Sequence, residues 1–342
     1  MTLEKTQIDM VRSKLSTEWQ HDFEQANERV KQFTTPVADV EGEYYEMPFV
    51  GGTEMKEYTG SRVDMENSVL MHAKRGMRYR KFYNCIDISI DEVDDMMNLE
   101  YTFSLIKAKQ KNAAAREADA IALGVIKDKT TGLYRVKKDS DGGFVGGILG
   151  TNYGGDGGMT KFELDLAYNG KNLIPVDWAS SGTGISSNFA GTLYDKIEYV
   201  KQKLAESDAF DSVNPGDICV AISPAEKRLL SAYEVGVNQD YGFGKLSEVG
   251  ATFNERLGVT FIVTNMLPLM NTTNKAGTAV NNARMCCAWL KSQVGYGVWR
   301  GADWTLKDVN GKVDVDHELR VRGKAGCARF RDDCVYVLPC VG

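Results

Sequence analysis

The sequence predicts an α+β fold organised around one unusually long helix. Three observations predict it. Residues 91–123 contain neither Pro nor Gly and repeat apolar side chains at helical spacing. Residues 217–223 and 259–265 are short apolar runs bounded by turn residues, which is typical of buried strands. Residues 41–82 have the strand and turn pattern of a long polar hairpin. The 342 residues suffice for one large domain or two intertwined smaller ones.

Composition and charge exclude several classes of function. The formal net charge is -6, which argues against a protein dedicated to gripping nucleic-acid phosphates. The N-terminus lacks the apolar core of a signal peptide, and no run approaches the ~18 apolar residues of a membrane span. We therefore expect a protein that is made in the cytosol and has no membrane partner.

The cysteines and histidines are not arranged for chemistry. The seven cysteines are odd in number and form no CxxC pair: Cys85, Cys219, Cys286, Cys287, Cys327, Cys334 and Cys340. His21, His72 and His317 are scattered. A structural zinc site needs such ligands in pairs at short spacing. We expect small buried thiols, no disulfide, no metal and no cofactor.

The first element predicted is an amphipathic helix over residues 12–33, with apolar side chains from Leu15 to Phe33 at three- and four-residue steps. Pro36 separates it from the next element. Two interpretations stay open. The helix packs on its own domain, or it is an arm that docks on a neighbouring subunit.

A hairpin comes next, with strands predicted over residues 42–50 and 62–70 and Gly-marked breaks between them. It has few aliphatic residues, so it should protrude or lie on another surface. The basic run at residues 72–81 is either a solvated face or a contact with an acidic neighbour or packaged DNA. Residues 82–90 are predicted to be a strand with alternating faces.

The long helix has the strongest local signal. Ser89 and Glu92 form a capping box at its start, and four acidic residues crowd its first turn, which suits the positive end of the helix dipole. The helix is predicted to end between Gly124 and Ile126, which makes it about 50 Å long. A helix of this length serves as a spine.

Residues 127–190 are Gly-rich and carry few structural signals. The run at residues 142–158 resembles a phosphate-binding loop only in its glycines, because it lacks GxxxxGK[ST] and the flanking strand and helix. We expect an irregular surface loop there. A second helix is predicted over residues 192–206.

The rest of the chain predicts a compact α/β unit. The strand at 217–223 leads into a helix at 224–232, which Ser223, Pro224 and Glu226 begin. Loops are predicted at 235–246 and 271–282. Closing strands are predicted at residues 284–290, 294–299, 318–322 and 333–338.

The order of these elements resembles the Hong Kong 97-type fold of the major capsid proteins of tailed double-stranded DNA phages, podovirus-like ones most closely. The likeness is carried by YRKFYNCIDISIDEVDDMMNLEYTFSLIKAKQKNAAAREADAIALGV, then ICVAISPAEKRLL, ATFNERLGVTFIVTNMLP, CAWLKSQVGYGV and LRVRGKAGCARFRDDCVYVL. It covers most of residues 12–340. The implied divisions are an N-terminal arm (1–40), an E-loop hairpin (41–82), a P-domain with the spine helix at about 91–126 and the Gly-rich insertion (83–213), an A-domain (214–290), and returning P-domain and A-domain strands (291–342).

The resemblance implies a structural, non-enzymatic protein that assembles into hexamers and pentamers of an icosahedral head enclosing DNA. Implied partners are further copies of the chain, a portal protein, a possible decoration protein and non-specifically contacted DNA. Because about 40 residues precede the hairpin, we expect a separate scaffolding protein to direct assembly. The implied location is the virion capsid, assembled in the host bacterial cytoplasm.

Two alternatives remain. An encapsulin-like nanocompartment shell shares the fold, and a neighbouring cargo-enzyme gene would favour it. An enzyme using the Gly-rich 142–158 loop is the other, although GxSxG, HExxH and metal-ligand spacings are absent. We therefore predict no catalytic, cofactor-binding or metal-binding residues.

Overall fold

The structure is a computed structural model of the chain. It describes residues 25, 27–50, 72–88, 99–142, 145–155, 159–168, 170–176, 178, 193–206, 217–237, 252–254, 258–274, 277–308 and 317–340.

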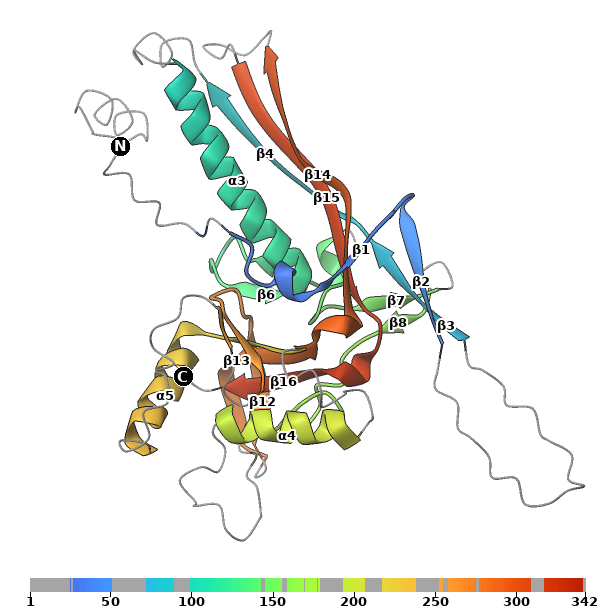
Figure 1. Cartoon of the computed structure of the whole chain (residues 1–342), viewed down its shortest axis with the longest axis vertical. Coiled ribbons are helices and arrows are strands. Elements are labelled where there is room, and N and C mark those ends of the chain that lie inside the picture. Colours follow the sequence, from blue (N-terminus) through green and yellow to red (C-terminus); the bar gives the residue numbers. More distant parts are fainter. Residues whose placement is uncertain are drawn as a thin grey trace, which may run out of the picture.

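Helix α3 (Leu99–Leu123) lies along a sheet of long strands and forms an elongated body with them (Figure 1). The sheet order is β1-β14-β15-β4. Its strands are β1 (Thr35–Val37), β4 (Arg80–Ile88), β14 (Val294–Asp308) and β15 (His317–Arg329). Strand β15 pairs antiparallel with β14 and β4, and β1 adds a short parallel edge to β14.

This long sheet is covered unevenly: near Ala328 both faces are packed, with Met47 and Met77 on one side, whereas β4 has one exposed face. Along β4 the half-buried Phe82, Asn84 and Ile86 alternate with the exposed Tyr83 and Cys85. Successive strand residues point to opposite faces, so one face meets α3 and the other is open. The predicted alternation of this strand is confirmed, although the strand begins at Arg80 rather than at Phe82.

The main apolar core lies in a compact six-stranded sheet of order β10-β11-β9-β13-β12, in which β16 also pairs with β13. Helices α4 (Leu193–Glu206) and α5 (Pro224–Val237) lie beside this sheet (Figure 1). The strands are β9 (Ile218–Ile222), β10 (Thr252–Asn254), β11 (Thr260–Val263), β12 (Leu269–Thr273), β13 (Ala279–Leu290) and β16 (Val335–Cys340). All residues of β9, β11 and β16 are buried, because neighbours cover both faces.

The predicted hairpin has its described stem in β2 (Tyr44–Val50) and β3 (His72–Arg78), paired from Tyr44 with Arg78 to Val50 with His72. Residues 51–71 lie outside the described residues, so the strand predicted at 62–70 is not tested. The basic run at 72–81 belongs largely to β3. Strands β7 (Asn152–Gly154) and β8 (Lys161–Phe162) extend this sheet.

The spine helix stops where a glycine forces a turn. Gly124 has a φ of +77°, a left-handed conformation that favours glycine. Strand β5 (Val125–Lys127) begins directly afterwards and pairs with β6 (Tyr134–Val136). The helix is thus confirmed within residues 99–123, and it ends at Leu123, one residue before the predicted range of Gly124 to Ile126. Its predicted start, with Ser89 and Glu92, lies outside the described residues.

Three other predictions need correction. Residues 27–33 of the predicted first helix are bends followed by a short 3-10 turn at Lys31–Phe33; residues 12–24 are not described. The predicted loop at 271–282 is largely a hairpin of β12 and β13. Helix α5 runs past residue 232 to Val237, so residues 235–237 of the predicted loop are helical, and residues 238–246 lie outside the described residues. Its N-cap is confirmed by Ser223 Oγ, which accepts the Glu226 N–H at 3.2 Å.

Candidate functional site

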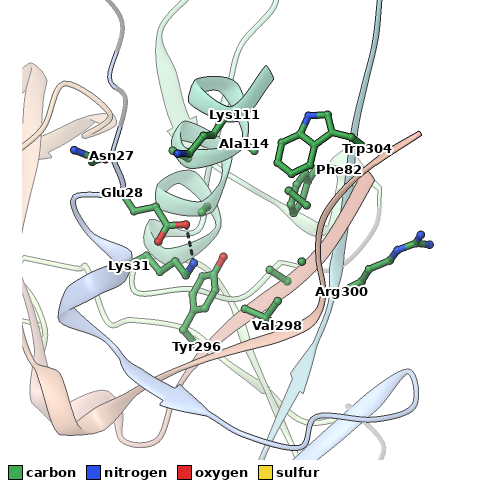
Figure 2. Close-up of a pocket in the computed structure, with 15 residues that line it drawn as sticks. Asn27, Glu28, Lys31, Phe82, Lys111, Ala114, Tyr296, Val298, Arg300 and Trp304 are labelled. Atoms are coloured by element: carbon green, nitrogen blue, oxygen red, sulfur yellow. Dashed lines mark hydrogen bonds and ion pairs between the residues drawn. The ribbon is translucent and has the colours of Figure 1, made fainter. Parts of the chain in front are cut away.

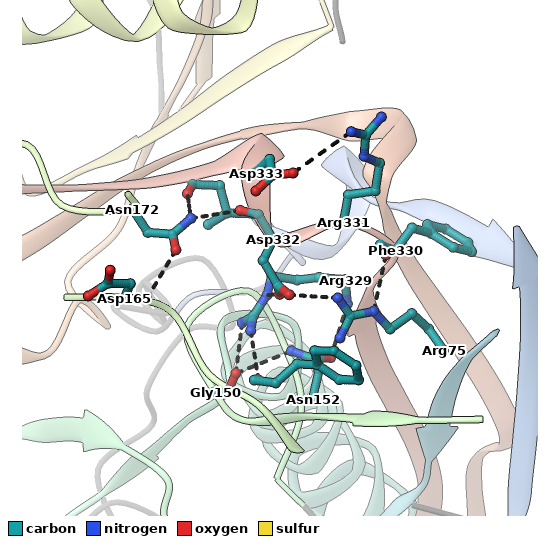
Figure 3. A network of polar contacts seen from close by, with 12 residues as sticks. Arg75, Gly150, Asn152, Asp165, Asn172, Arg329, Phe330, Arg331, Asp332 and Asp333 are labelled. Atoms are coloured by element: carbon teal, nitrogen blue, oxygen red, sulfur yellow. Dashed lines mark hydrogen bonds and ion pairs between the residues drawn. The ribbon is translucent and has the colours of Figure 1, made fainter. Parts of the chain in front are cut away.

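Arg329 is the centre of a buried polar network that joins four distant segments (Figure 3). Its side chain is fully buried at the end of β15. Nη1 donates to the carbonyl oxygens of Gly147, Ile148 and Gly150, at 3.2, 2.6 and 2.7 Å. Nη2 donates to the Phe162 carbonyl at 3.2 Å. A planar guanidinium suits this site because its donors spread in a fixed fork.

Asp332 balances that charge and connects Arg329 to the hairpin stem. Arg329 Nε donates to Asp332 Oδ1 at 3.0 Å, and Arg75 Nη2 on β3 donates to Asp332 Oδ2 at 2.6 Å. The Arg75 guanidinium also lies 3.4 Å from the ring centre of Phe162. Burial lowers the pKa of Arg329, and Asp332 opposes that shift. Two cations that share one carboxylate hold β3, β8 and the β15–β16 corner together.

Two buried asparagines complete this network. Asn152 Oδ1 accepts the Arg329 N–H at 3.0 Å, while its amide donates to the carbonyls of Gly147 and Gly150. Asn172 donates to the carbonyls of Asp332 and Val335, at 2.7 and 2.9 Å. Buried polar atoms are costly unless they are paired, so this network specifies one arrangement of the corner.

The Gly-rich run is therefore a structural clamp, and the expectation of a surface loop is wrong for its residues 146–150, which are buried. The N–H groups of Ile148 and Leu149 donate to the carbonyls of Ala122 and Leu123 at the end of α3, at 2.9 and 3.0 Å. A Cβ on Gly147 would lie 2.4 Å from the backbone nitrogen of Gly124. Only glycine permits this approach.

The same clamp has the wrong polarity for a phosphate loop. Phosphate loops point backbone N–H groups at an anion. Here the carbonyls converge on a cation, the Arg329 side chain. Among the described residues, no group of three or more His, Cys, Asp or Glu side chains could hold a metal ion. The geometry therefore gives the alternative of an enzyme using the 142–158 loop no support.

Asp119 anchors the N-terminal segment to the spine helix. Its fully buried carboxylate accepts the backbone N–H groups of Arg29, Val30 and Lys31, at 2.8–3.1 Å. Gln25 Nε2 donates to Asp119 Oδ2 at 2.5 Å. Burial raises the pKa of Asp119, and these donors oppose the shift. The anchor explains why no α-helix runs through residues 29–31 into the 3-10 turn, because their amides point to a carboxylate on another element rather than to preceding carbonyls.

A groove of about 280 Å³ lies between α3 and the covered face of the long sheet (Figure 2). The helix contributes Ala114, Ala115 and Ala118, and the opposite wall consists of Phe82, Tyr296, Val298 and Trp304. At its rim Lys31 pairs with Glu28 at 2.6 Å, while Arg300 points away from the helix (Figure 2). Glu28 is the one carboxylate among the described residues of this lining. The groove suits an apolar side chain rather than acid–base chemistry.

Charge is distributed unevenly along the chain. The segments 72–88, 99–127, 294–308 and 317–329 together contain 16 Lys and Arg but 7 Asp and Glu, whereas the whole chain contains 41 and 47. These segments form β3, α3, β5 and the long strands. An acidic protein thus has a strongly basic elongated body, and such a separation of charge favours contacts between unlike surfaces.

Solved structures resemble this chain over almost its whole length. The Cyanophage P-SCSP1u capsid structure is 14% identical, covers 97% of this chain and 94% of its own, and has a TM-score of 0.57. The Ralstonia phage GP4 capsid is 8% identical, with 96% and 95% covered and a TM-score of 0.57. The bacteriophage PhiM1 mature capsid is 13% identical, with 92% and 88% covered and a TM-score of 0.54.

This is a phage capsid fold. No family model matches the sequence, and no curated protein does. With identities this low, the likeness is one of fold. The predicted Hong Kong 97-type, α+β capsid fold is confirmed.

Several features of this capsid fold had no clear sequence signal. The basic run at 72–81 was interpreted as a solvated face or a partner contact, yet its Arg75 is buried and ion-paired. Asp119 and Arg329 were not singled out, because one buried charge in a helix or strand resembles any surface charge in sequence. Arg329 is the last residue of the segment GKAGCAR. The Gly, Ala and Cys residues of this segment are the one indication in the sequence of a closely packed site.

The cysteines are free, and six of the seven are buried. Burial raises the pKa of Cys219 and Cys327 to about 12. Such thiols stay protonated and are poor nucleophiles at neutral pH. No helix among the described residues is long and apolar enough to cross a membrane.

Proposed function

We propose that the protein is the major capsid protein of a tailed double-stranded DNA phage and assembles into pentamers and hexamers of an icosahedral head. The observation that carries this proposal is the near-complete mutual coverage with phage capsid chains, from the N-terminal segment to the last strand. A shared module would match part of each chain. Here the whole architecture matches, including the hairpin stem and the spine helix.

The sheet topology supports the domain divisions that we propose. The long sheet with α3 corresponds to the P-domain, and the six-stranded sheet with α5 corresponds to the A-domain. Helix α4 falls within the proposed P-domain range of 83–213 but contacts β16 and α5. The stem of β2 and β3 is the base of the E-loop, and the segment before β1 is the N-terminal arm. Strands β14, β15 and β16 return through both domains, so the chain crosses between them more than once.

The physical form of the subunit also supports assembly. The open face of β4 exposes Tyr83, which is 75% exposed. Closed shells need large surfaces that meet copies of the same chain. An exposed, partly apolar and basic sheet face supplies such a surface. Monomeric proteins rarely expose a large apolar patch that no partner covers.

The proposed partners follow from the proposed role. They are copies of the chain, a separate scaffolding protein during assembly, a portal protein, a possible decoration protein and packaged DNA in non-specific contact. We place the protein in the virion, after assembly in the host bacterial cytoplasm. We propose no catalytic activity and no cofactor.

Assembly is tested by expressing the chain alone and together with its scaffolding protein, followed by light scattering and electron microscopy. We expect open or aberrant particles from the chain alone and closed icosahedral shells from the pair. A chain that stays monomeric under both conditions contradicts the proposed function. Uniform closed shells from the chain alone contradict the need for a scaffolding protein.

The hairpin offers a sharper test, although residues 51–71 lie outside the described residues. Deleting Thr53 to Thr59 and joining Gly52 to Gly60 removes seven residues, most of them polar, that add little apolar area to a core. We expect subunit stability to change by about 0.5 kcal/mol or less and shell formation to fail. A matched control replaces the same seven residues with Gly and Ser, so it keeps the length and loses the side chains. Wild-type particles from the deletion show that the hairpin is not an intersubunit arm.

A further inference from the structure

A second cleft, of about 700 Å³, lies between the end of α3, the β5–β6 hairpin and the connection from β11 to β12. It is separate from the groove of Figure 2. Its described lining is Gln25, Arg29, Arg116, Lys127, Gly132, Leu133, Tyr134, Asn265, Met266, Leu267, Leu269 and Arg284. The two clefts share no lining residue.

The charged residues of this cleft are all basic. Arg29, Arg116, Lys127 and Arg284 come from four different elements, and the described lining contains no Asp or Glu. Two of them are held in place by the backbone: Arg29 Nη1 donates to the Val263 carbonyl at 3.2 Å, and Arg284 Nη1 to the Leu267 carbonyl at 3.4 Å. Four cations gathered around one cavity, in a chain of net charge -6, favour an anionic occupant.

The cleft also has an apolar part. Leu133, 52% exposed, and the partly buried Tyr134 and Leu269 present apolar surface, and Met266 and Leu267 are buried behind them. Cations beside Met, Leu and Tyr side chains suit a peptide with both carboxylates and aromatic rings. A nucleic-acid backbone would use the cations and leave the apolar wall unused, so a peptide fits the lining better.

The chain itself has such a peptide next to the cleft. Residues 16–24, STEWQHDFE, contain three carboxylates (Glu18, Asp22 and Glu24), two aromatic residues (Trp19 and Phe23) and neither Lys nor Arg. They lie outside the described residues and lead directly into Gln25, which lines the cleft. Gln25 is fixed there by its hydrogen bond to Asp119. An extended residue spans at most about 3.6 Å, so Asp22 lies within about 11 Å of that fixed point.

We propose that residues 16–24 dock in the basic cleft of their own subunit, with the carboxylates facing Arg29, Arg116, Lys127 and Arg284 and the aromatic rings against Leu133, Tyr134 and Leu269. This goes beyond the proposed shell function. It also decides between the two interpretations of the N-terminal segment, in favour of packing on its own subunit. The docked segment neutralises the cleft, so that the surface of an isolated subunit exposes less positive charge.

Charge reversal tests the contact in the purified chain. One variant, Arg116→Glu with Lys127→Glu, reverses the cleft, and another, Glu18→Lys with Asp22→Lys and Glu24→Lys, reverses the segment. The readout is amide hydrogen exchange of residues 16–24, with circular dichroism to verify folding. We expect exchange in the wild type to be about tenfold slower than in either variant, and combining both reversals to restore slow exchange. At about 0.5 M salt, where the screening length is about 4 Å, wild-type protection should fall.

A matched control is Lys307→Glu with Arg322→Glu, which makes the same charge change at two exposed positions of the long strands. We expect it to leave the exchange of residues 16–24 unchanged. The segment variant alters residues outside the main core, so it stays informative if the cleft variant fails to fold. Fast exchange in the wild type overturns the proposal, as does a combined variant without restored protection.

Crosslinking identifies the subunit to which the segment belongs. A carbodiimide joins paired carboxylates and amines, and Lys127 is the amine of the cleft. In a mixture of ¹⁵N-labelled and unlabelled chains, we expect links from residues 18–24 to Lys127 within one isotopic species. Links between labelled and unlabelled chains overturn docking within the subunit. If the cleft variant instead weakens binding of duplex DNA and leaves exchange unchanged, the cleft is a phosphate site and the proposal fails.

Discussion

The six-stranded sheet and the long four-stranded sheet bury their side chains in opposite ways. In β9, every residue from Ile218 to Ile222 is buried, and β16 is buried throughout. In β4, half-buried and exposed residues alternate. The compact sheet is thus a complete core within one chain. The long sheet is packed on both faces at residues 325–329 but leaves one face of β4 exposed, which suits a body that completes its packing beside another molecule.

The two regions also differ in how polar groups are used. The compact sheet depends on apolar contact, whereas the long sheet ends at a buried guanidinium, Arg329, that holds the corner into β16. Apolar packing tolerates substitutions of similar volume. A buried charge network tolerates little, because removing one member leaves the others unpaired. The comparison therefore predicts that the most sensitive position is polar and lies where the two regions meet.

The largest effect is expected for Arg329→Met. It leaves the carbonyls of Gly147, Ile148 and Gly150 without this donor and removes one of two cations from Asp332. We expect a loss of about 3–5 kcal/mol in the free energy of unfolding, measured by urea denaturation, or an insoluble chain. The exposed neighbour, in Arg331→Met, should change it by about 0.5 kcal/mol or less. Equal effects of the two changes would show that the network does not hold the corner.

Ala114→Pro should rank close behind. Ala114 lies within α3, where Pro removes a backbone hydrogen bond and clashes with the preceding turn, at a cost of about 3 kcal/mol or more. We expect the chain to lose helical circular dichroism and to fail to fold. Ala114→Gly is the matched control and should cost about 1 kcal/mol. A soluble proline variant with an unchanged spectrum would contradict a continuous spine helix.

Asp119→Ala should have an intermediate effect. It leaves the N–H groups of Arg29, Val30 and Lys31 without their acceptor, and we expect a loss of about 1–3 kcal/mol. Those amides should exchange hydrogen faster while the six-stranded sheet stays protected. The exposed Asp333 is the control, and Asp333→Ala should leave them unchanged. Unfolding of the whole chain would show that the anchor belongs to the core rather than to the arm.

Sequence patterns predicted the regular elements of both regions. They did not predict the long-range polar and backbone contacts that join these elements. The strand at β9, the cap at Ser223 and the buried stripe of α4 follow from local periodicity and capping chemistry, which each depend on a few neighbouring residues. The end of α3 was misplaced because it depends on contacts with the distant clamp at residues 146–150. Helical spacing in residues 27–33 was overridden by Asp119, some 90 positions away.

The polar network was beyond sequence reasoning for the same reason. Glycines at 146, 147 and 150 indicate freedom of the backbone, and a surface loop and a close-packed clamp need the same freedom. Their burial depends on Arg329, about 180 positions later, which occupies the space among their carbonyls. Local sequence does not indicate that contact. The sequence argued against a phosphate loop because the run lacks the motif's lysine and the flanking strand and helix, and in the structure carbonyls rather than N–H groups converge there.

The smallest effect on folding is expected at Tyr83, on the open face of the long sheet. Tyr83→Ala and Tyr336→Ala are a matched pair, since the same atoms are removed from β4 and from β16. Tyr336 is 8% exposed and packs in the main core, so its truncation should cost about 3 kcal/mol. Tyr83 is 75% exposed, so its truncation should change the free energy of unfolding by about 0.5 kcal/mol or less. If the proposed shell forms and a second copy covers this face, the order of sensitivity reverses in assembly: the Tyr83 variant folds normally but yields fewer closed particles by electron microscopy. Normal particle yields from that variant would show that this part of the open face stays uncovered. A destabilised Tyr83 subunit would instead show that β4 is packed on both faces within one chain.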